Sequence, residues 1–330
     1  MERALDALDE GTATRARTAL AGLRRMDGGT DLGMEVVRAY LWRVLPVEAG
    51  GRDRHEAAWA LGDLFEAAGL VEQAALARSA TTHEIFAVWR WTESFSAVAP
   101  RFWRPALERL GPTPAAPARV GLSVASARAM LEVVGDAGVE LGADGGLSAA
   151  TVTRLDDRFR WTEEFPWMHH GGESGLPPVR FLREHLTAQR LMVHDHGRLA
   201  LTAAGRAAVD DLAALWRALV SPAPRWSHEF DRDVLGLMAA ALTGSGVFEP
   251  DRLAEELAAP LASKWRSAGQ GAIVEGASLV LHAWYQLGVP LGWWDTGRGP
   301  ADRHPNAFGR AAAGAVFRSM GHPVQRPLVR

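Results

Sequence analysis

The chain has 330 residues, enough for two or three units that each bury a core, and its 48% hydrophobic and 23% charged content is ordinary for globular proteins. It has no cysteine, which excludes disulfides and any site that needs a thiolate. The net charge of −3 at pH 7 lacks the basic surplus of dedicated nucleic-acid binders.

The basic residues and the first segment of the chain indicate the kind of genome that encodes the protein and its location in the cell. All of the 36 basic residues except Lys264 are arginine, which is typical of a GC-rich bacterial genome. The sequence contains no run of eighteen apolar residues, and it starts with the acidic segment MERALDALDE where a secretory signal would be basic. We therefore expect a cytoplasmic protein without a membrane partner.

Residues 1–111 predict a helical domain. The leucine spacing favours a helix over 1–26 with an interruption near Gly11, and a second helix over 32–45 closed by Pro46.

Two further features belong to the same domain. Residues 55–78 contain a break at Gly69 and predict a helical hairpin. Residues 84–104 are dense in phenylalanine and tryptophan, which predicts either a core between helices or a ligand surface. The uncharged, proline-rich stretch 112–117 is a linker and ends the domain.

Residues 118–220 predict helices and short strands in alternation. The predicted elements are a helix over 123–134, a strand over 139–141, a helix from the cap Ser148 to Phe159, a helix over 179–190, strands over 191–193 and 199–201 joined by a turn over 194–197, and a helix capped by Thr202.

This order resembles the winged helix-turn-helix superfamily, with 179–190 as the helix that reads a DNA groove and the hairpin as the wing. The cadence Gln189-Arg190-Leu191, Gly197-Arg198-Leu199-Ala200-Leu201-Thr202 and Gly205-Arg206 carries the resemblance. Residues 120–320 also resemble the C-terminal region of uncharacterised actinobacterial proteins named after a plasmid open reading frame. That family implies no established reaction.

The segment 160–176 departs from the winged pattern, which has a tight turn at this point. An insertion there could block or reshape the surface that reads DNA.

The last domain, 221–330, predicts a helix from 251 that Pro260 ends or kinks, a helix over 272–287 and a strand over 288–294. Asn306-Ala-Phe-Gly309-Arg310 parallels Thr202-Ala-Ala-Gly205-Arg206, 104 residues earlier. We interpret this domain as helical, with a second, degenerate winged unit. The adjacent Trp293 and Trp294 cannot both face one core from a strand, which predicts either one exposed ring that contacts a partner or ligand, or a second winged unit that packs against another domain there.

The candidate contacts to DNA or to a protein partner lie on the predicted reading helix and on the wing. They are Arg180, Arg183, Gln189, Arg190 and Arg198. Arginine can bind guanine or phosphate, and glutamine can pair with adenine. An ordinary charged helix face explains the same residues equally well.

A second set of residues predicts a ligand pocket between the N-terminal aromatic cluster and the insertion. It comprises Trp89, Trp91, Trp103, Trp161, Trp167, His169 and His170.

The sequence gives less support for a metal site or a catalytic site than for the partner contacts and the ligand pocket. His194 and His196 would share a face on a strand and lose that geometry in a hairpin tip, so solvated histidines are the favoured interpretation. Glu163, Glu164 and Glu173 lie in a predicted loop without a nucleophile. Phosphate-loop, dinucleotide, metalloprotease and serine-hydrolase motifs are absent from the sequence, so we expect no cofactor and no resident metal.

Together these patterns predict a mainly α protein that acts as a non-enzymatic regulator or adaptor, binds DNA or a protein through the winged unit, and could form a homodimer. The alternative is an enzyme or a small-molecule-binding protein in which the winged unit is a scaffold or a dimerisation domain.

Overall fold

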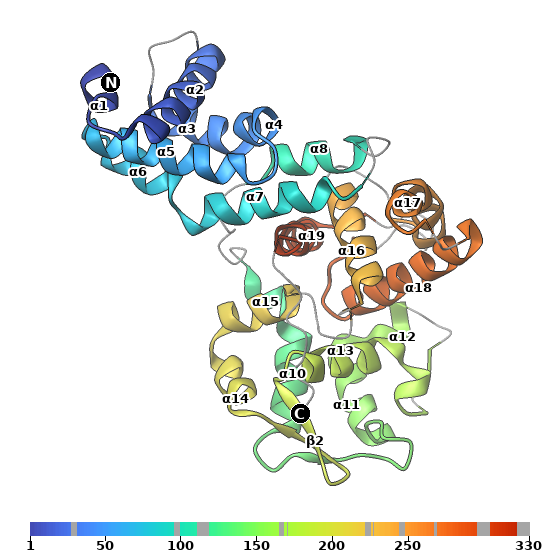
Figure 1. Ribbon diagram of the computed structural model, residues 1–330. Coiled ribbons are helices and arrows are strands. Elements are labelled where there is room, and N and C mark those ends of the chain that lie inside the picture. Colours follow the sequence, from blue (N-terminus) through green and yellow to red (C-terminus); the bar gives the residue numbers. More distant parts are fainter. Residues whose placement is uncertain are drawn as a thin grey trace. The chain divides into compact units, whose positions relative to one another are not determined.

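The computed structural model describes residues 1–27, 32–95, 100–110, 119–164, 168–169, 171–221, 226, 228–243, 248–266, 269–295 and 304–321. These residues are mainly helical, with one small three-stranded antiparallel sheet (Figure 1). The chain separates into two compact units. Unit 1 comprises Met1–Ser96, Trp103–Thr113 and Arg318–Pro323, and unit 2 comprises Ala97–Phe102, Pro114–Phe317 and Val324–Arg330. The linker predicted over 112–117 lies outside the described residues.

Unit 1 is helical. Its elements are α1 (Glu2–Leu5), α2 (Glu10–Asp27), α3 (Met34–Ala39), the π-helical turn η1 (Tyr40–Val44), α4 (Leu45–Glu48), α5 (Asp53–Ala67), α6 (Val71–Ala77), α7 (Ala80–Thr92) and most of α8 (Pro100–Glu108). The predicted helical hairpin is confirmed as α5 and α6. Gly69, with φ of 78°, turns the chain between them, a conformation that a residue with a side chain rarely adopts.

The first helix breaks earlier than predicted. The sequence placed the interruption near Gly11, whereas α1 ends at Leu5 and α2 starts at Glu10. The carboxylate of Asp9 accepts a hydrogen bond from the backbone N–H of Thr12 at 3.0 Å, as an N-cap residue does. This cap sets the start of α2, and Gly11 lies inside its first turn.

Pro46 does not close its helix as predicted. The chain passes through the wider η1 turn and continues as α4, where Pro46 occupies the first turn and needs no N–H donor. Pro46 also cannot donate to the carbonyl of Trp42 four residues earlier. The indole Nε1 of Trp89 donates to that carbonyl instead, at 3.1 Å.

A buried arginine ties three segments of unit 1 together. Arg54 is 0% exposed. Its guanidinium donates to the carbonyls of Ala49 and Phe86 and pairs with Glu93 at the end of α7. The buried charge is therefore compensated on several sides, as a charge in a protein interior requires.

Unit 2 holds the sheet. Its elements are α9 (Val120–Ser123), α10 (Ala125–Val134), β1 (Val139–Glu140), α11 (Ala149–Phe159), α12 (Trp161–Glu164), the 3₁₀ turn η2 (Glu173–Gly175), α13 (Pro177–Ala188), β2 (Met192–Asp195), β3 (Arg198–Leu201), α14 (Ala203–Asp210), α15 (Leu212–Val220), α16 (Glu229–Leu242), α17 (Pro250–Lys264), α18 (Gln270–Gly288) and α19 (Ala307–Ser319). The predicted cap Ser148 is confirmed, because its side chain accepts from the N–H of Thr151.

The three strands lie in the order β1-β3-β2, and both pairs are antiparallel. β2 and β3 are joined by His196 and Gly197 alone, with φ of 46° and 79°. Two consecutive positive φ angles are what a two-residue type I′ hairpin turn requires. The predicted four-residue turn over 194–197 is therefore wrong, and His194 and Asp195 belong to β2.

The junction between β3 and α14 explains the spacing of Thr202 and Gly205. The hydroxyl of Thr202 accepts from the N–H of Gly205 at 3.0 Å and donates to the carbonyl of Arg190 at 2.7 Å. A Cβ on Gly205 would lie 1.9 Å from the carbonyl oxygen of Leu191. Threonine thus caps the helix, and glycine lets the helix approach the preceding backbone.

The junction that leads into α19 has the same geometry. Asn306 accepts from the N–H of Gly309 at 3.1 Å, and its own N–H donates to the carbonyl of Trp293 at 3.0 Å. The N–H of Thr202 donates in the same way to the carbonyl of Leu191, at 3.1 Å. A Cβ on Gly309 would lie 2.4 Å from the carbonyl oxygen of Trp293.

The last third differs from the predictions at Pro260 and over 288–294. Pro260 does not end its helix, since α17 continues to Lys264, and the alternative of a kink at Pro260 stays a prediction. The strand predicted over 288–294 is wrong: residues 288–293 form no strand, and a bridge between Trp294 and Pro305 follows. Trp293 and Trp294 are both buried, at 0% and 4% exposure, so neither is the exposed ring that the sequence allowed.

The two rings pack against different neighbours. Trp293 contacts Trp284 at 4.8 Å between ring centroids, and Trp294 contacts Phe248 at 4.7 Å.

The only lysine of the sequence joins α16 to α17. The Nζ atom of Lys264 lies 2.7 Å from the buried carboxylate of Asp233 and 2.8 Å from Glu229. These two carboxylates hold the pKa of Lys264 above its ordinary value, against the opposing effect of burial. Among the described helices, none is long and apolar enough to cross a lipid bilayer.

Candidate functional site

The predicted reading helix, α13, is packed on most of its surface. Val179, Leu182 and Leu186 are each 0% exposed. The helix contacts α10, α18, β2 and η2 within unit 2, and Figure 1 shows α13 beside α18. What remains exposed is a narrow strip that includes Arg180, whose guanidinium lies 3.9 Å from Glu184 one turn later. The helix is therefore not an accessible rod of charged side chains.

Arg183 lies inside the unit, where the sequence had placed it among the exposed contacts. Its side chain is 10% exposed and makes two parallel hydrogen bonds to the carboxylate of Glu173, at 2.7 and 2.8 Å. Glu173 belongs to the insertion and is 3% exposed. A third guanidinium nitrogen lies 3.1 Å from Nε2 of His194 on β2. The pair joins the insertion, α13 and the hairpin.

Of the other residues predicted to contact DNA or a partner, two already bond to groups within the chain. The amide of Gln189 donates to the carbonyl of Ser221 at 2.7 Å. Arg198 bonds to Glu140 at 3.2 Å and to two backbone carbonyls before β1. Arg190 is exposed, and its side chain forms no ion pair or hydrogen bond with the described residues. A continuous band of free arginines is therefore not present on this part of the chain.

The histidines near the hairpin have separate surroundings. His185 is 0% exposed and bonds through Nε2 to the carbonyl of Leu219 at 2.9 Å. His194 faces Arg183, whereas His196 lies in the turn and bonds to Asp195 at 2.6 Å. The described residues include no group of three or more histidine and acidic side chains that could hold a metal ion.

The insertion is an ordered part of unit 2 where it is described. Trp161 is buried and stacks on Phe159, with 5.2 Å between ring centroids. His169 is exposed, and its Nδ1 accepts from the N–H of Gly171 at 3.2 Å. Trp167 and His170 lie outside the described residues.

The N-terminal aromatic cluster belongs to unit 1, and the insertion belongs to unit 2. Trp103 is buried against Phe95, and Trp91 meets the same ring edge-on at 5.0 Å. Trp89 is half-buried and lines a hollow of about 340 Å³ with Arg43 and Arg104. The predicted pocket between the cluster and the insertion stays a prediction.

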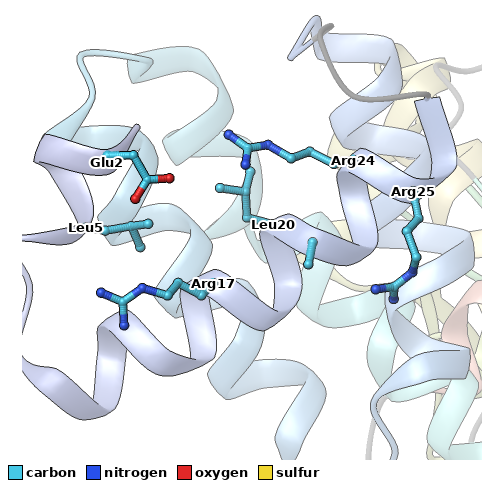
Figure 2. A pocket seen from close by; sticks show the side chains of 7 residues that line it. Glu2, Leu5, Arg17, Leu20, Arg24 and Arg25 are labelled. Carbon is cyan, nitrogen blue, oxygen red and sulfur yellow. The ribbon is translucent and has the colours of Figure 1, made fainter.

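Unit 1 has a second hollow, of about 520 Å³, along α1 and α2 (Figure 2). Arg17 and Arg24 lie two helical turns apart on α2, with Leu20 between them, and Glu2 and Leu5 come from α1. The two leucines are only 2% exposed. This hollow is lined by three arginines, Arg17, Arg24 and Arg25, and by one carboxylate, Glu2.

Unit 1 contains a pair of histidines in contact that the sequence patterns did not predict. His55 on α5 and His83 on α7 stack with 5.1 Å between ring centroids, and their Nδ1 atoms are 2.9 Å apart. A hydrogen bond between two ring nitrogens requires one of them to be unprotonated. Burial lowers the pKa of both histidines, and in His55 the charge of His83 adds to this effect.

Sequence reasoning missed Arg43 and Arg104, and it considered Glu173 only as a loop carboxylate for acid–base chemistry, not as the buried partner of Arg183. Glu173 follows two glycines in a segment without helical or strand periodicity, so nothing indicated its burial. Arg43 and Arg104 lie 61 positions apart in helical segments, and their common hollow depends on how those helices pack.

No protein-family model matches the chain, no curated protein matches it in sequence, and no solved structure matches it in fold. The function must therefore be inferred from the residues themselves.

Proposed function

We propose that residues 118–220 form a winged helix-turn-helix unit, that 221–330 contain a second, degenerate one, and that the chain is a non-enzymatic adaptor that binds a protein partner. The order α10, β1, α11, α13, β2, β3, with β1 paired to β3, supports the first assignment. The repeated junction geometry at Gly205 and Gly309 supports the second.

The buried Glu173–Arg183 pair is the observation that carries the choice of a protein over DNA. A helix that reads a major groove must present its side chains to the base edges. In α13 the central arginine is neutralised by a carboxylate, and the helix packs against α18. Reading DNA with this helix would require a buried ion pair to break, which costs about 3–5 kcal/mol when one partner is left uncompensated.

The hairpin offers a surface that suits a protein. β2 lies at one edge of the sheet, and its Val193 is 45% exposed. Its neighbours carry charges of both signs, from Asp195 and Arg198. An extended segment of a partner can add to such an edge by backbone hydrogen bonds, with the exposed valine as an apolar contact.

Site-specific photo-crosslinking in the producing cells tests this proposal. A photoreactive residue at position 193 is expected to form a covalent adduct with one protein species. The same residue at position 122 is the matched control, because Leu122 is also an exposed apolar residue, 67% exposed, on unit 2. Adducts with many proteins at both positions would contradict a specific surface.

Binding to DNA is measured separately with the purified full chain and a labelled duplex of random sequence. We expect no binding at low salt. Binding whose affinity falls steeply with salt, and that Arg190→Glu weakens, would overturn the choice of a protein partner and favour a DNA-binding role.

A further inference from the structure

The hollow beside Trp89 has the elements of a small-molecule site. It lies within unit 1, where η1 and α4, α7 and α8 meet. Its volume is about 340 Å³, at the lower end of the range of about 300–1,000 Å³ for small-molecule sites. The lining residues are Arg43, Val47, Trp89, Arg104, Leu107 and Glu108.

Trp89 provides an aromatic wall that is held in place. Its indole Nε1 donates to the carbonyl of Trp42 at 3.1 Å, and the side chain remains half-buried. Val47 beside it is 67% exposed, so apolar surface is accessible in the hollow. A ring fixed in this way loses little conformational freedom when a flat ligand packs against it.

Two arginines give the hollow positive charge. Arg43 and Arg104 are exposed, and neither forms an ion pair or a hydrogen bond with another residue that the structure describes. Elsewhere in unit 1 the arginines Arg38, Arg54 and Arg78 are paired with carboxylates. Guanidinium groups bind carboxylates, sulfonates and phosphates through parallel hydrogen bonds, so this pair of side chains is suited to an anionic group.

The position of Arg43 depends on the π-helical turn. η1 covers Tyr40–Val44, and π-helical turns inside helices are frequent at functional sites. The turn precedes Pro46, which cannot donate to the carbonyl of Trp42 and thereby leaves that carbonyl to Trp89. The same local geometry thus presents Arg43 and holds the aromatic wall.

We propose that this hollow binds a small planar aromatic anion. The ring packs on Trp89 and Val47, and the anionic group lies between Arg43 and Arg104. Glu108 disfavours a second negative charge and can accept a hydrogen bond from a donor on the ligand. This site is independent of the proposed partner surface on unit 2.

Isothermal titration of the full chain with 1-naphthoate tests the proposal, with the uncharged 1-naphthalenemethanol as the matched ligand. We expect one binding site for naphthoate and at least tenfold weaker binding of the alcohol, since hydrogen bonds to a charged group are stronger than those to a neutral group. Arg43→Gln and Arg104→Gln should each weaken naphthoate binding about tenfold. Glu108→Gln should strengthen it, because the variant removes a repelling carboxylate.

Matched substitutions outside the hollow separate this site from general adhesion. Arg90→Gln removes an exposed charge next to Trp89 in sequence, and Trp59→Leu removes a ring that is 50% exposed on α5. Both should bind naphthoate like the wild type. Absence of binding up to about 1 mM, equal binding of acid and alcohol, or unchanged binding in both glutamine variants of Arg43 and Arg104 would overturn the proposal.

Discussion

The Glu173–Arg183 pair permits a prediction whose size follows from its burial. Glu173→Gln removes the charge but keeps the shape of the side chain. It leaves Arg183, whose side chain is 10% exposed, with no carboxylate opposite its guanidinium. Arg183→Met leaves the carboxylate of Glu173, 3% exposed, in the complementary position.

Each single variant should destabilise unit 2 by about 3–5 kcal/mol, the range measured when one partner of a buried pair is removed. For a unit of this size, 1 kcal/mol lowers the melting temperature by about 2–4 °C, so we expect a decrease of about 6–20 °C. The double variant Glu173→Met with Arg183→Met should be close to the wild type, because it removes both charges and keeps similar volume.

Hydrogen exchange measured by mass spectrometry is the suitable assay. Thirteen tryptophans are spread over both units, so fluorescence would average two unfolding transitions. Peptides from α13 and the insertion should exchange faster in both single variants, and peptides from α5 should not change.

Two results would refute this reasoning. One is a Glu173→Gln variant within about 0.5 kcal/mol of the wild type, which is the size of an ordinary surface substitution. The other is a double variant whose loss equals the sum of the two single losses, because additivity would mean that the side chains do not interact.

Three further predictions concern other parts of the chain. Gly205→Ala and Gly309→Ala should each destabilise unit 2 by about 1–3 kcal/mol or more, since the new Cβ would meet a backbone carbonyl oxygen. Arg54→Met should destabilise unit 1, as the carbonyls and the carboxylate around it lose their donor, and thermal unfolding should start at lower temperature. Between the ordinary histidine pKa of 6.5 and the lowered pKa values of His55 and His83, stability should fall as the pH falls, because the unfolded chain binds protons that the folded chain does not.

Each of these has a matched test. Gly269→Ala has no neighbour within 4 Å of the new Cβ and should unfold like the wild type. The pH dependence should diminish in the double variant His55→Gln with His83→Gln, and an unchanged profile below pH 6.5 would contradict the assignment to this pair. An Arg54→Met chain as stable as the wild type would show that the surrounding carbonyls find other donors.

Local sequence patterns predicted the elements of unit 2 well at positions where the residue type favours one particular local structure, such as a helix cap. Ser148 and Thr202 cap their helices. Gly205 lies where α14 packs so closely against the backbone of Leu191 that a Cβ would clash. The hairpin was predicted, but its turn was placed too wide, because Asp195 is a common turn residue and here, with His194, extends β2.

Long-range packing accounts for what the sequence did not reveal. Helical periodicity identified the apolar face of α13, but no pattern could say that α18 would cover part of the helix or that Arg183 would meet Glu173. Pro46 was expected to close a helix and Pro260 to end or kink one, and neither helix ends at its proline. Pro46 lies in a first turn and Pro260 inside a helix, and tertiary contacts outweigh a single missing hydrogen bond.

The position of Lys264 restricts how the chain can be modified. Enzymes that acetylate side-chain amines or conjugate ubiquitin-like tags to them would find one lysine in 330 residues, and its side chain is 19% exposed and bound to two carboxylates. Neutralising that amine would leave Asp233, which is 1% exposed, as a buried charge without its cation. Acylation at this position would therefore disturb the packing of α16 against α17. The chain is poorly suited to regulation by covalent modification of surface lysines.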